Sequence, residues 1–185
     1  MLLDDDVRAR LAAAVERLQP VAPGVAWVAR DNVHLTLKFL GAVDNDRLAA
    51  LESSLASAAA GQVPFDLTVH GLGAFPSRIR ARVLWAGIGA GAAELAALAT
   101  RVDAALAALG FARETRPFAA HVTLGRVREP RANPRLAAAL EAGGPLGGQR
   151  VARISLMRSD LSPRGARYSE LAGLSLMGAV STPGG

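Results

Sequence analysis

Two stretches of this chain share one pattern, and they read His34-Leu35-Thr36-Leu37-Lys38-Phe39-Leu40-Gly41 and His121-Val122-Thr123-Leu124-Gly125-Arg126-Val127. In each, a histidine and a threonine stand two residues apart between apolar neighbours. Side chains on a β-strand alternate between its faces, so this spacing puts histidine and threonine on one face and anchors the other in a core. We expect strands over residues 33–40 and 120–127 that present two imidazoles and two hydroxyls to one cleft.

The residues around these stretches predict a mixture of helices and strands. Apolar residues at helical spacing behind three aspartates favour a helix over 4–18, and Asn133-Pro134 has the order typical of a helix start. The expected helices cover 4–18, 45–60, 92–109 and 134–141, the expected strands cover 25–29, 63–69, 82–88, 150–158 and 167–176, and 71–76 reads as a loop. Each half carries one His/Thr strand, so we expect an α+β fold in which one domain, residues 1–185, is made of two similar lobes.

Composition limits the classes of function. A chain of 185 residues can bury a core without disulfides. No apolar run approaches the roughly 20 residues needed to span a membrane, and the first residues lack the basic and apolar regions of a secretory signal. We therefore expect a soluble, cytoplasmic protein with no membrane partner. Cysteine is absent, which excludes thiol catalysis and zinc-thiolate sites.

The chain is strongly basic, and almost all of its positive charge comes from arginine. The net charge is +5, the pI is about 11.1, and Lys38 is the only lysine. Arginine presents a planar fork of donors that suits phosphate and can stack on bases, which favours a polyanionic partner. Coding bias of the genome explains the same excess equally well, because net charge bears on non-specific association.

The three histidines differ in their surroundings. Two occupy equivalent places in the repeated pattern, while His70 lacks it and is expected to be structural. Imidazole titrates near pH 6.5, so one histidine can act as a base while its partner acts as an acid. Threonine hydroxyls can donate to oxygens that gain negative charge. This set suits phosphate-ester hydrolysis without a metal or cofactor, since two histidines with no evident third ligand make a poor zinc site.

A glycine-rich stretch offers a rival hypothesis. Residues 83–92 contain Gly-x-Gly-x-x-Ala after a predicted strand, close to a dinucleotide-binding fingerprint. Such a fingerprint expects a further strand ending in an acidic residue about 20 positions later. Here that region holds Arg113 and Glu114 in a segment rich in arginine and proline, so a plain turn between strand and helix is the preferred interpretation.

Three further residues are candidates for substrate contact. Strand alternation puts Arg126 on the side opposite His121 unless the strand bends or ends there, so it is either solvent-facing or a phosphate contact at the rim. Phe118 and Tyr168 could stack on a base. Core packing is the alternative for both aromatic residues.

Taken in order, these motifs resemble the 2H phosphoesterase superfamily, and within it the RNA 2',3'-cyclic phosphodiesterases, also called 2'-5' RNA ligases. The resemblance rests on residues 32–41, 71–76, 83–87, 116–118 and 121–127. It implies a bilobal α+β fold with two antiparallel sheets facing a central cleft and helices packed outside. It also implies metal-independent hydrolysis of a terminal 2',3'-cyclic phosphate to a 2'-phosphate.

The resemblance also assigns roles to residues. His121 would be the base that activates water and His34 the acid that protonates the departing 3'-oxygen, with Thr36 and Thr123 binding the phosphate and Arg126 contacting substrate. The expected partners are RNA ends with a 2',3'-cyclic phosphate or small cyclic nucleotides, bound by a monomer. Ligation as the physiological direction and non-catalytic binding of RNA ends stay open as alternatives.

The chain departs from the family's usual pattern at its start. Family members usually begin with an apolar strand before the first helix, whereas only Met1-Leu2-Leu3 precedes Asp4 here. We therefore expect either a truncated start or a strand missing from one sheet.

Overall fold

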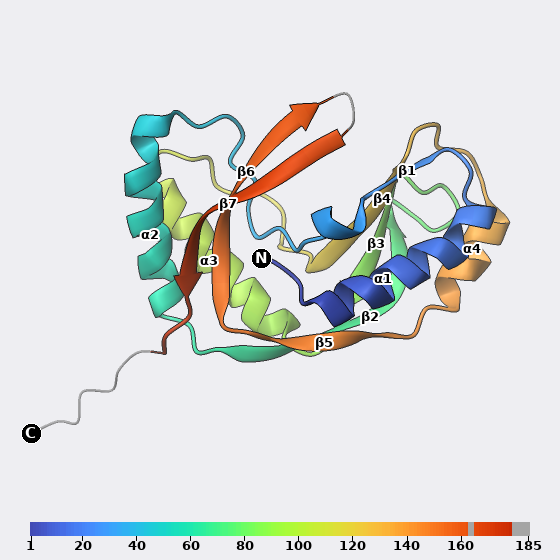
Figure 1. The fold of residues 1–185 in the computed structure, drawn as a ribbon, viewed down its shortest axis with the longest axis horizontal. Helices are drawn as coiled ribbons and strands as arrows, with labels where there is room; N and C mark the ends of the chain where they lie inside the picture. The colour runs from blue at the N-terminus through green and yellow to red at the C-terminus, as the bar shows by residue number, and fades with distance from the viewer. Residues whose placement is uncertain (163–164, 179–185) are drawn as a thin grey trace, which may run out of the picture.

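The computed structural model describes residues 1–162 and 165–178 (Figure 1). Its helices and strands, in chain order, are α1 (Asp5–Leu18), β1 (Val25–Trp27), α2 (Leu48–Ala60), β2 (Phe65–Phe75), β3 (Val83–Ile88), α3 (Ala92–Ala107), β4 (His121–Val127), α4 (Pro134–Glu141), β5 (Pro145–Val151), β6 (Arg153–Ser162) and β7 (Gly165–Ser175). There are also three short 3-10 helices among the described residues, η1 (Gln19–Val21), η2 (Arg30–Asn32) and η3 (Asn45–Arg47).

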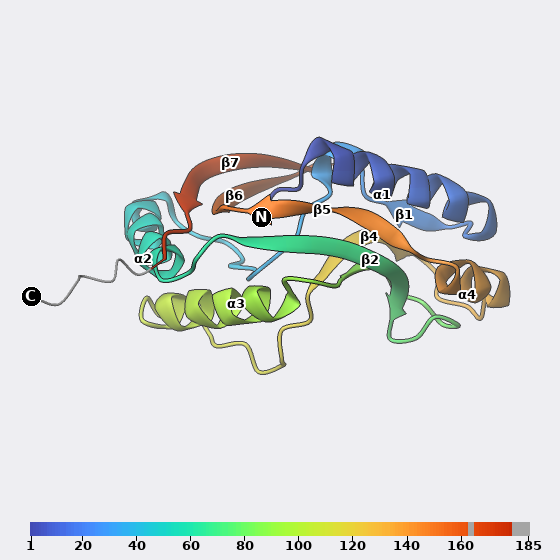
Figure 2. The same cartoon turned by 90° about the horizontal axis from the view of Figure 1, so that it is seen from below.

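The strands form two antiparallel sheets. Five of them pair in the order β1-β4-β3-β2-β5, and β6 and β7 form a hairpin. Helices α1 and α4 lie toward one end of the molecule and α2 and α3 toward the other, with the long strands β2 and β5 running between them (Figures 1 and 2). The expected α+β fold with two antiparallel sheets is confirmed.

One face of the five-stranded sheet is anchored in the core. Alternate residues of its three central strands are at most 1% exposed, namely Leu67, Val69, Leu84, Ala86, Val122 and Leu124. They belong to one hydrophobic cluster with Val7 and Leu11 of α1 and Leu140 of α4. The opposite face carries His121 and Thr123 of β4 and Trp85 and Gly87 of β3, and we call it the motif face.

The prediction of a strand over residues 33–40 is wrong, because no regular strand forms there. Only single bridges occur there, one joining Leu2 to His34 and one joining Leu35 to Val122. The reason is that β4 begins at His121, so residues beyond Thr36 have no strand to pair with. On the other side, the carbonyl of Leu124 is already taken by the N–H of Val28, at 2.9 Å.

Residues 1–3 run beside the first motif without forming a regular strand. Besides the bridge from Leu2 to His34, the N–H of Leu35 donates to the carbonyl of Met1 at 3.1 Å, and the amino group of Met1 donates to the carbonyl of Leu35 at 2.8 Å. Residues 1–3 therefore pack against the first motif through a single bridge and form no regular strand, as one of the two expectations for the start of the chain had it.

Two other expectations are corrected by the structure. Residues 71–75 of the predicted loop belong to β2, where Gly71 adopts a φ of 75° at the point at which the pairing with β3 shifts register, and only Pro76 lies outside the strand. The strand predicted over 150–158 is divided between β5, which already begins at Pro145, and β6. His70, which was expected to be structural, lies on β2 with an exposed side chain.

The glycine-rich stretch joins β3 to α3 as a turn. Gly91 has a φ of 81° at the N-terminus of α3, and a Cβ there would lie 2.6 Å from the carbonyl oxygen of Asp66. Both its conformation and its close approach to β2 require glycine. The turn therefore has a structural explanation, as the sequence interpretation preferred.

Candidate active site

The two motifs meet at an antiparallel β-bridge between Leu35 and Val122, the residues that separate histidine from threonine in each copy. Both bridging side chains are 0% exposed, so they point into the core. Neighbouring residues of an extended chain point the other way. The residues that project together from the opposite side are His34, Thr36, His121 and Thr123. The structure thus brings the two predicted pairs to one place.

Each histidine is oriented by the same local hydrogen bond. Nδ1 of His34 lies 2.7 Å from the carbonyl oxygen of Asn32, and Nδ1 of His121 lies 2.7 Å from that of Ala119. A carbonyl can only accept, so Nδ1 carries the hydrogen and donates in both cases. This leaves Nε2 of each ring as the nitrogen that can take or give a proton.

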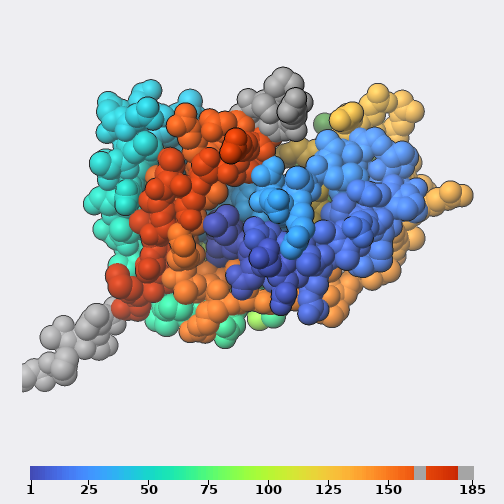
Figure 3. Space-filling model, in the orientation of Figure 1, coloured from blue at the N-terminus to red at the C-terminus, as the bar shows by residue number. Residues whose placement is uncertain are grey.

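The β6–β7 hairpin covers the first motif. The ring of Tyr168 on β7 packs edge-on against His34, with 4.8 Å between ring centroids. The amide nitrogen of Asn32 donates to the carbonyl of Ala166 at 2.7 Å. Figure 3 shows the orange-red hairpin beside the blue N-terminal part of the chain. These contacts fix the hairpin over His34.

Burial is the main influence on the charge of His34. It lowers the pKa of His34 below the ordinary imidazole value, while the bond to the carbonyl of Asn32 raises it and the nearby amino group of Met1 lowers it. The neutral form is therefore favoured in the free protein. A bound anionic phosphate would act in the opposite direction, because a negative neighbour stabilises imidazolium.

Aromatic side chains surround the second motif. Phe75 contacts His121 edge-on, with ring centroids 5.2 Å apart, and packs against Trp85 at 5.3 Å. The Trp85 indole occupies the space over Gly73, where a Cβ would lie 2.3 Å from the ring. Phe118 is half-buried and packs against the core, which favours the packing alternative for that residue.

A β-bulge brings Arg126 to the face of His121. The pairing of β4 with β3 shifts by one residue between Thr123 and Gly125, and a bulge of this kind reverses strand alternation. The partner of Arg126 is Val83, which is two residues from the partner of Thr123 and so shares its face. Arg126 is exposed there, at the edge of the motif face. Simple alternation would put Arg126 on the side opposite His121, and the bulge is the bend of the strand that reverses this placement.

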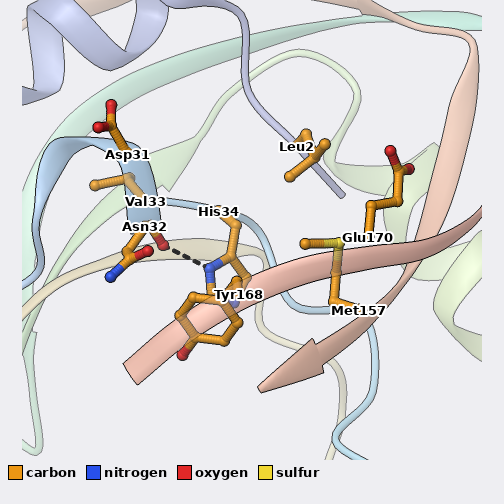
Figure 4. A pocket seen from close by; sticks show the side chains of 8 residues that line it. All are labelled: Leu2, Asp31, Asn32, Val33, His34, Met157, Tyr168 and Glu170. Atoms are coloured by element: carbon orange, nitrogen blue, oxygen red, sulfur yellow. Dashed lines mark hydrogen bonds between the residues drawn. The ribbon is translucent and has the colours of Figure 1, made fainter. Parts of the chain in front are cut away.

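A pocket of about 210 Å³ adjoins His34 (Figure 4). Its lining consists of Leu2, Asp31, Asn32, Val33, His34, Met157, Tyr168 and Glu170. Of the four motif side chains only His34 lines it, so the pocket is a neighbour of the site and does not contain both histidines. Its polar contributions include the carboxylate of Asp31, which is unfavourable to phosphate, and that of Glu170, which is paired with Arg153.

Comparison with known proteins places the chain in a family. The model of the LigT like phosphoesterases matches residues 2–85 and 88–168. The chain belongs to this family. Its membership of the 2H phosphoesterases, expected from the motifs, is confirmed, and so is the expectation of a hydrolase.

Relatives of this phosphoesterase match over nearly the whole chain. An RNA 2',3'-cyclic phosphodiesterase of Methanothermobacter thermautotrophicus is 32% identical over 91% of this chain and 92% of its own length. A crystal structure from Thermus thermophilus superposes with a TM-score of 0.79 at 28% identity, covering 96% and 95% of the two chains. Escherichia coli LigT in complex with 3'-AMP gives 0.74 at 29% identity, covering 95% and 94%.

One feature of the phosphoesterase that sequence reasoning missed is a buried ion pair beside the site. Nζ of Lys38, two residues after Thr36, donates to the carboxylate of Asp103 on α3 and to the carbonyl of Ala112, the latter at 2.6 Å. Oδ1 of Asp103 also accepts from the N–H of Glu114 at 3.1 Å. The side chains of Lys38 and Asp103 are 4% and 14% exposed. One ammonium thus ties the segment after the first motif to the segment before the second.

The charges of this cluster support one another. The hydrogen bond from Lys38 is the largest cause that holds the pKa of Asp103 below its usual value, followed by the bond from the N–H of Glu114. Arg113 adds a second cation, with Nη1 3.8 Å from Oδ2 of Asp103. The signal in the sequence was that Lys38 is the only lysine in an arginine-rich chain, but nothing local pointed to a partner 65 residues away.

Within residues 1–162 and 165–178 no three histidine, aspartate or glutamate side chains gather closely enough to hold a metal ion. In the same part of the chain, no helix is long and apolar enough to cross a membrane.

Proposed function

We propose that this phosphoesterase hydrolyses 2',3'-cyclic phosphates of RNA ends or nucleosides to 2'-phosphates, with His34 and His121 as its acid and base. The observation that supports the proposal is the antiparallel bridge between Leu35 and Val122, next to two imidazoles that each make the same hydrogen bond from Nδ1 to the carbonyl two residues earlier. The name of the Methanothermobacter relative and the 3'-AMP complex of LigT support the choice of substrate.

The proposed reaction is a displacement at phosphorus. Nε2 of His121 takes a proton from water as the water oxygen attacks, the bond from phosphorus to the 3'-oxygen breaks, and Nε2 of protonated His34 gives its proton to that oxygen. The products are a 2'-phosphate and a free 3'-hydroxyl. Exchange of one proton with solvent at each histidine restores the starting state.

The remaining motif side chains stabilise charge in this scheme. The hydroxyls of Thr36 and Thr123 donate to the non-bridging phosphate oxygens, which carry more negative charge in the transition state than in the substrate. The guanidinium of Arg126, on the same face because of the bulge, offsets part of that charge.

The test is hydrolysis of 2',3'-cyclic AMP by His34→Ala and His121→Ala. Each substitution should lower kcat by about 10²- to 10⁴-fold, the usual contribution of one general acid or base, and the product should be 2'-AMP. Melting curves check that the variants fold. Undiminished hydrolysis in either variant would refute the paired-histidine mechanism. Faster joining of RNA halves than hydrolysis of their cyclic ends by the same preparation would reverse the proposed direction.

A further inference from the structure

Strand β4 and the residue that follows it carry polar side chains beyond the candidate active site. After His121, Thr123 and Arg126 on the motif face comes Arg128. Its N–H donates to the carbonyl of Gly24 at 3.1 Å, which extends the pairing of β4 with β1 by one residue. Arg128 follows the last residue of β4, at a bend, and this hydrogen bond holds its backbone at the end of the sheet, two residues from Arg126.

Both arginines are available to an anion. They are exposed, and among residues 1–162 and 165–178 no carboxylate lies within salt-bridge distance of either guanidinium. Arg128 is seven residues after His121, so with one bulge the segment between them is about 20 Å long. This exceeds the length that a single nucleotide needs.

An aromatic ring lies beside this segment. Phe75 pairs with Val83, which pairs with Arg126, so the three residues form one row across β2, β3 and β4. Phe75 is 38% exposed although it contacts His121. A partly exposed ring next to two unpaired arginines is the combination used to bind single-stranded nucleic acid, in which bases stack on aromatic rings and phosphates meet cations.

We propose that Phe75, Arg126 and Arg128 form an upstream surface that binds the single-stranded RNA leading to the terminal cyclic phosphate. The inference rests on the proposed function, because His121 marks where that phosphate is held. Phe75 stacks on a base that precedes the terminal nucleotide, and Arg128 contacts an upstream phosphate, while Arg126, at the end of the surface nearest His121, stays with the terminal phosphate. Beside His34 lies the pocket lined by Asp31 and Glu170; Glu170 is paired with Arg153, and the carboxylate of Asp31 disfavours an RNA backbone there.

The experiment compares two substrates, 2',3'-cyclic AMP and an adenylate hexamer that ends in a 2',3'-cyclic phosphate. The variants are Arg128→Gln and Phe75→Leu, and the matched control is Arg135→Gln. Arg135 is also exposed and without a carboxylate partner among the described residues, but it lies on α4. The measured quantity is the ratio of kcat/KM for the hexamer to kcat/KM for the mononucleotide.

Phe75→Leu should lower this ratio about fivefold or more, the lower end of what loss of one stacked base costs, and Arg128→Gln should lower it through the lost phosphate contact. Arg128→Gln should also reduce the slope of log KM for the hexamer against log salt by about 0.7, the value for one phosphate contact on a single strand. Arg135→Gln should change neither quantity.

The outcomes separate the two proposals. If the unmodified protein turns over neither substrate, the proposed function fails. If it turns over both, and Arg128→Gln and Phe75→Leu leave the ratio and the salt slope unchanged, the upstream surface is overturned while the function stands. An equal fall in Arg135→Gln would also overturn it, because the effect would then reflect total charge and no particular surface.

Discussion

The two copies of the His-x-Thr motif lie side by side, yet the fold holds them in different ways. His121 begins a regular strand and lies opposite Gly87 of β3, whereas His34 sits in an irregular segment joined to its neighbours by single bridges. In both copies, Nδ1 donates to the carbonyl two residues earlier. The motif itself therefore sets the orientation of each ring. The position of His121 is set by the sheet, whereas the position of His34 is set by polar contacts with distant segments of the chain.

The largest expected effect tests whether the two histidines do different chemistry. With an aryl phosphodiester such as bis(p-nitrophenyl) phosphate, the leaving group departs without a proton, so the acid becomes unnecessary. His34→Ala should lose about a thousandfold in kcat on 2',3'-cyclic AMP but less than about tenfold on the aryl ester. His121→Ala should lose heavily on both, because water must be activated in either case.

The unmodified protein assayed on both substrates provides the reference for each loss. If the pattern is exchanged between the two variants, His34 is the base and His121 the acid, and the assignment proposed above is reversed. Equal losses on both substrates in both variants would contradict any division of labour between the rings.

A smaller effect is expected from the contact that positions the first motif. Lys38→Met removes the ammonium that joins the segments flanking the two motifs, and it leaves Asp103 with only the more distant Arg113 as a cation. Displacement of a catalytic group by about 1 Å can cost up to 100-fold in rate. We expect kcat on 2',3'-cyclic AMP to fall about tenfold, with a lower Tm.

The controls separate positioning from stability. Arg150→Met breaks an exposed pair with Asp66 and should leave kcat unchanged, and Lys38→Arg should restore part of the rate by restoring the charge. A variant Lys38→Met that melts earlier but keeps its kcat at temperatures where it is folded would show that the ion pair is only structural.

Much of the fold follows from local sequence patterns. Val7, Leu11 and Val15 are buried on α1 as their spacing predicts. Asn133 caps α4, where its Oδ1 accepts from the N–H of Leu136 at 3.0 Å. These features depend on residues close together in sequence, which is why sequence reasoning reached them. The meeting of the two motifs was also expected, because their repetition is visible in the chain.

What could not be predicted depends on contacts between distant segments. The bulge that turns Arg126 to the motif face occurs at Leu124, which has no partner between the pairs Trp85–Thr123 and Leu84–Gly125, and it is known only once β3 and β4 are paired. The partner of Lys38 is equally remote. The division of the chain into two similar lobes stays a prediction.

The smallest expected effect concerns the pH dependence of the first motif. The ring of Tyr168 contributes to the burial that lowers the pKa of His34, because burial disfavours the charged imidazolium. Tyr168→Leu lets water reach His34 and should raise its pKa, while Tyr168→Phe keeps the ring and should leave the profile of kcat/KM against pH in place. As the acid, His34 works while protonated, so activity falls as pH rises through its pKa.

Tyr168→Leu should therefore move the alkaline limb of the profile to higher pH. A shift of the acidic limb instead would identify His34 as the base, and a profile in which neither limb moves would contradict the role of Tyr168 in burying it.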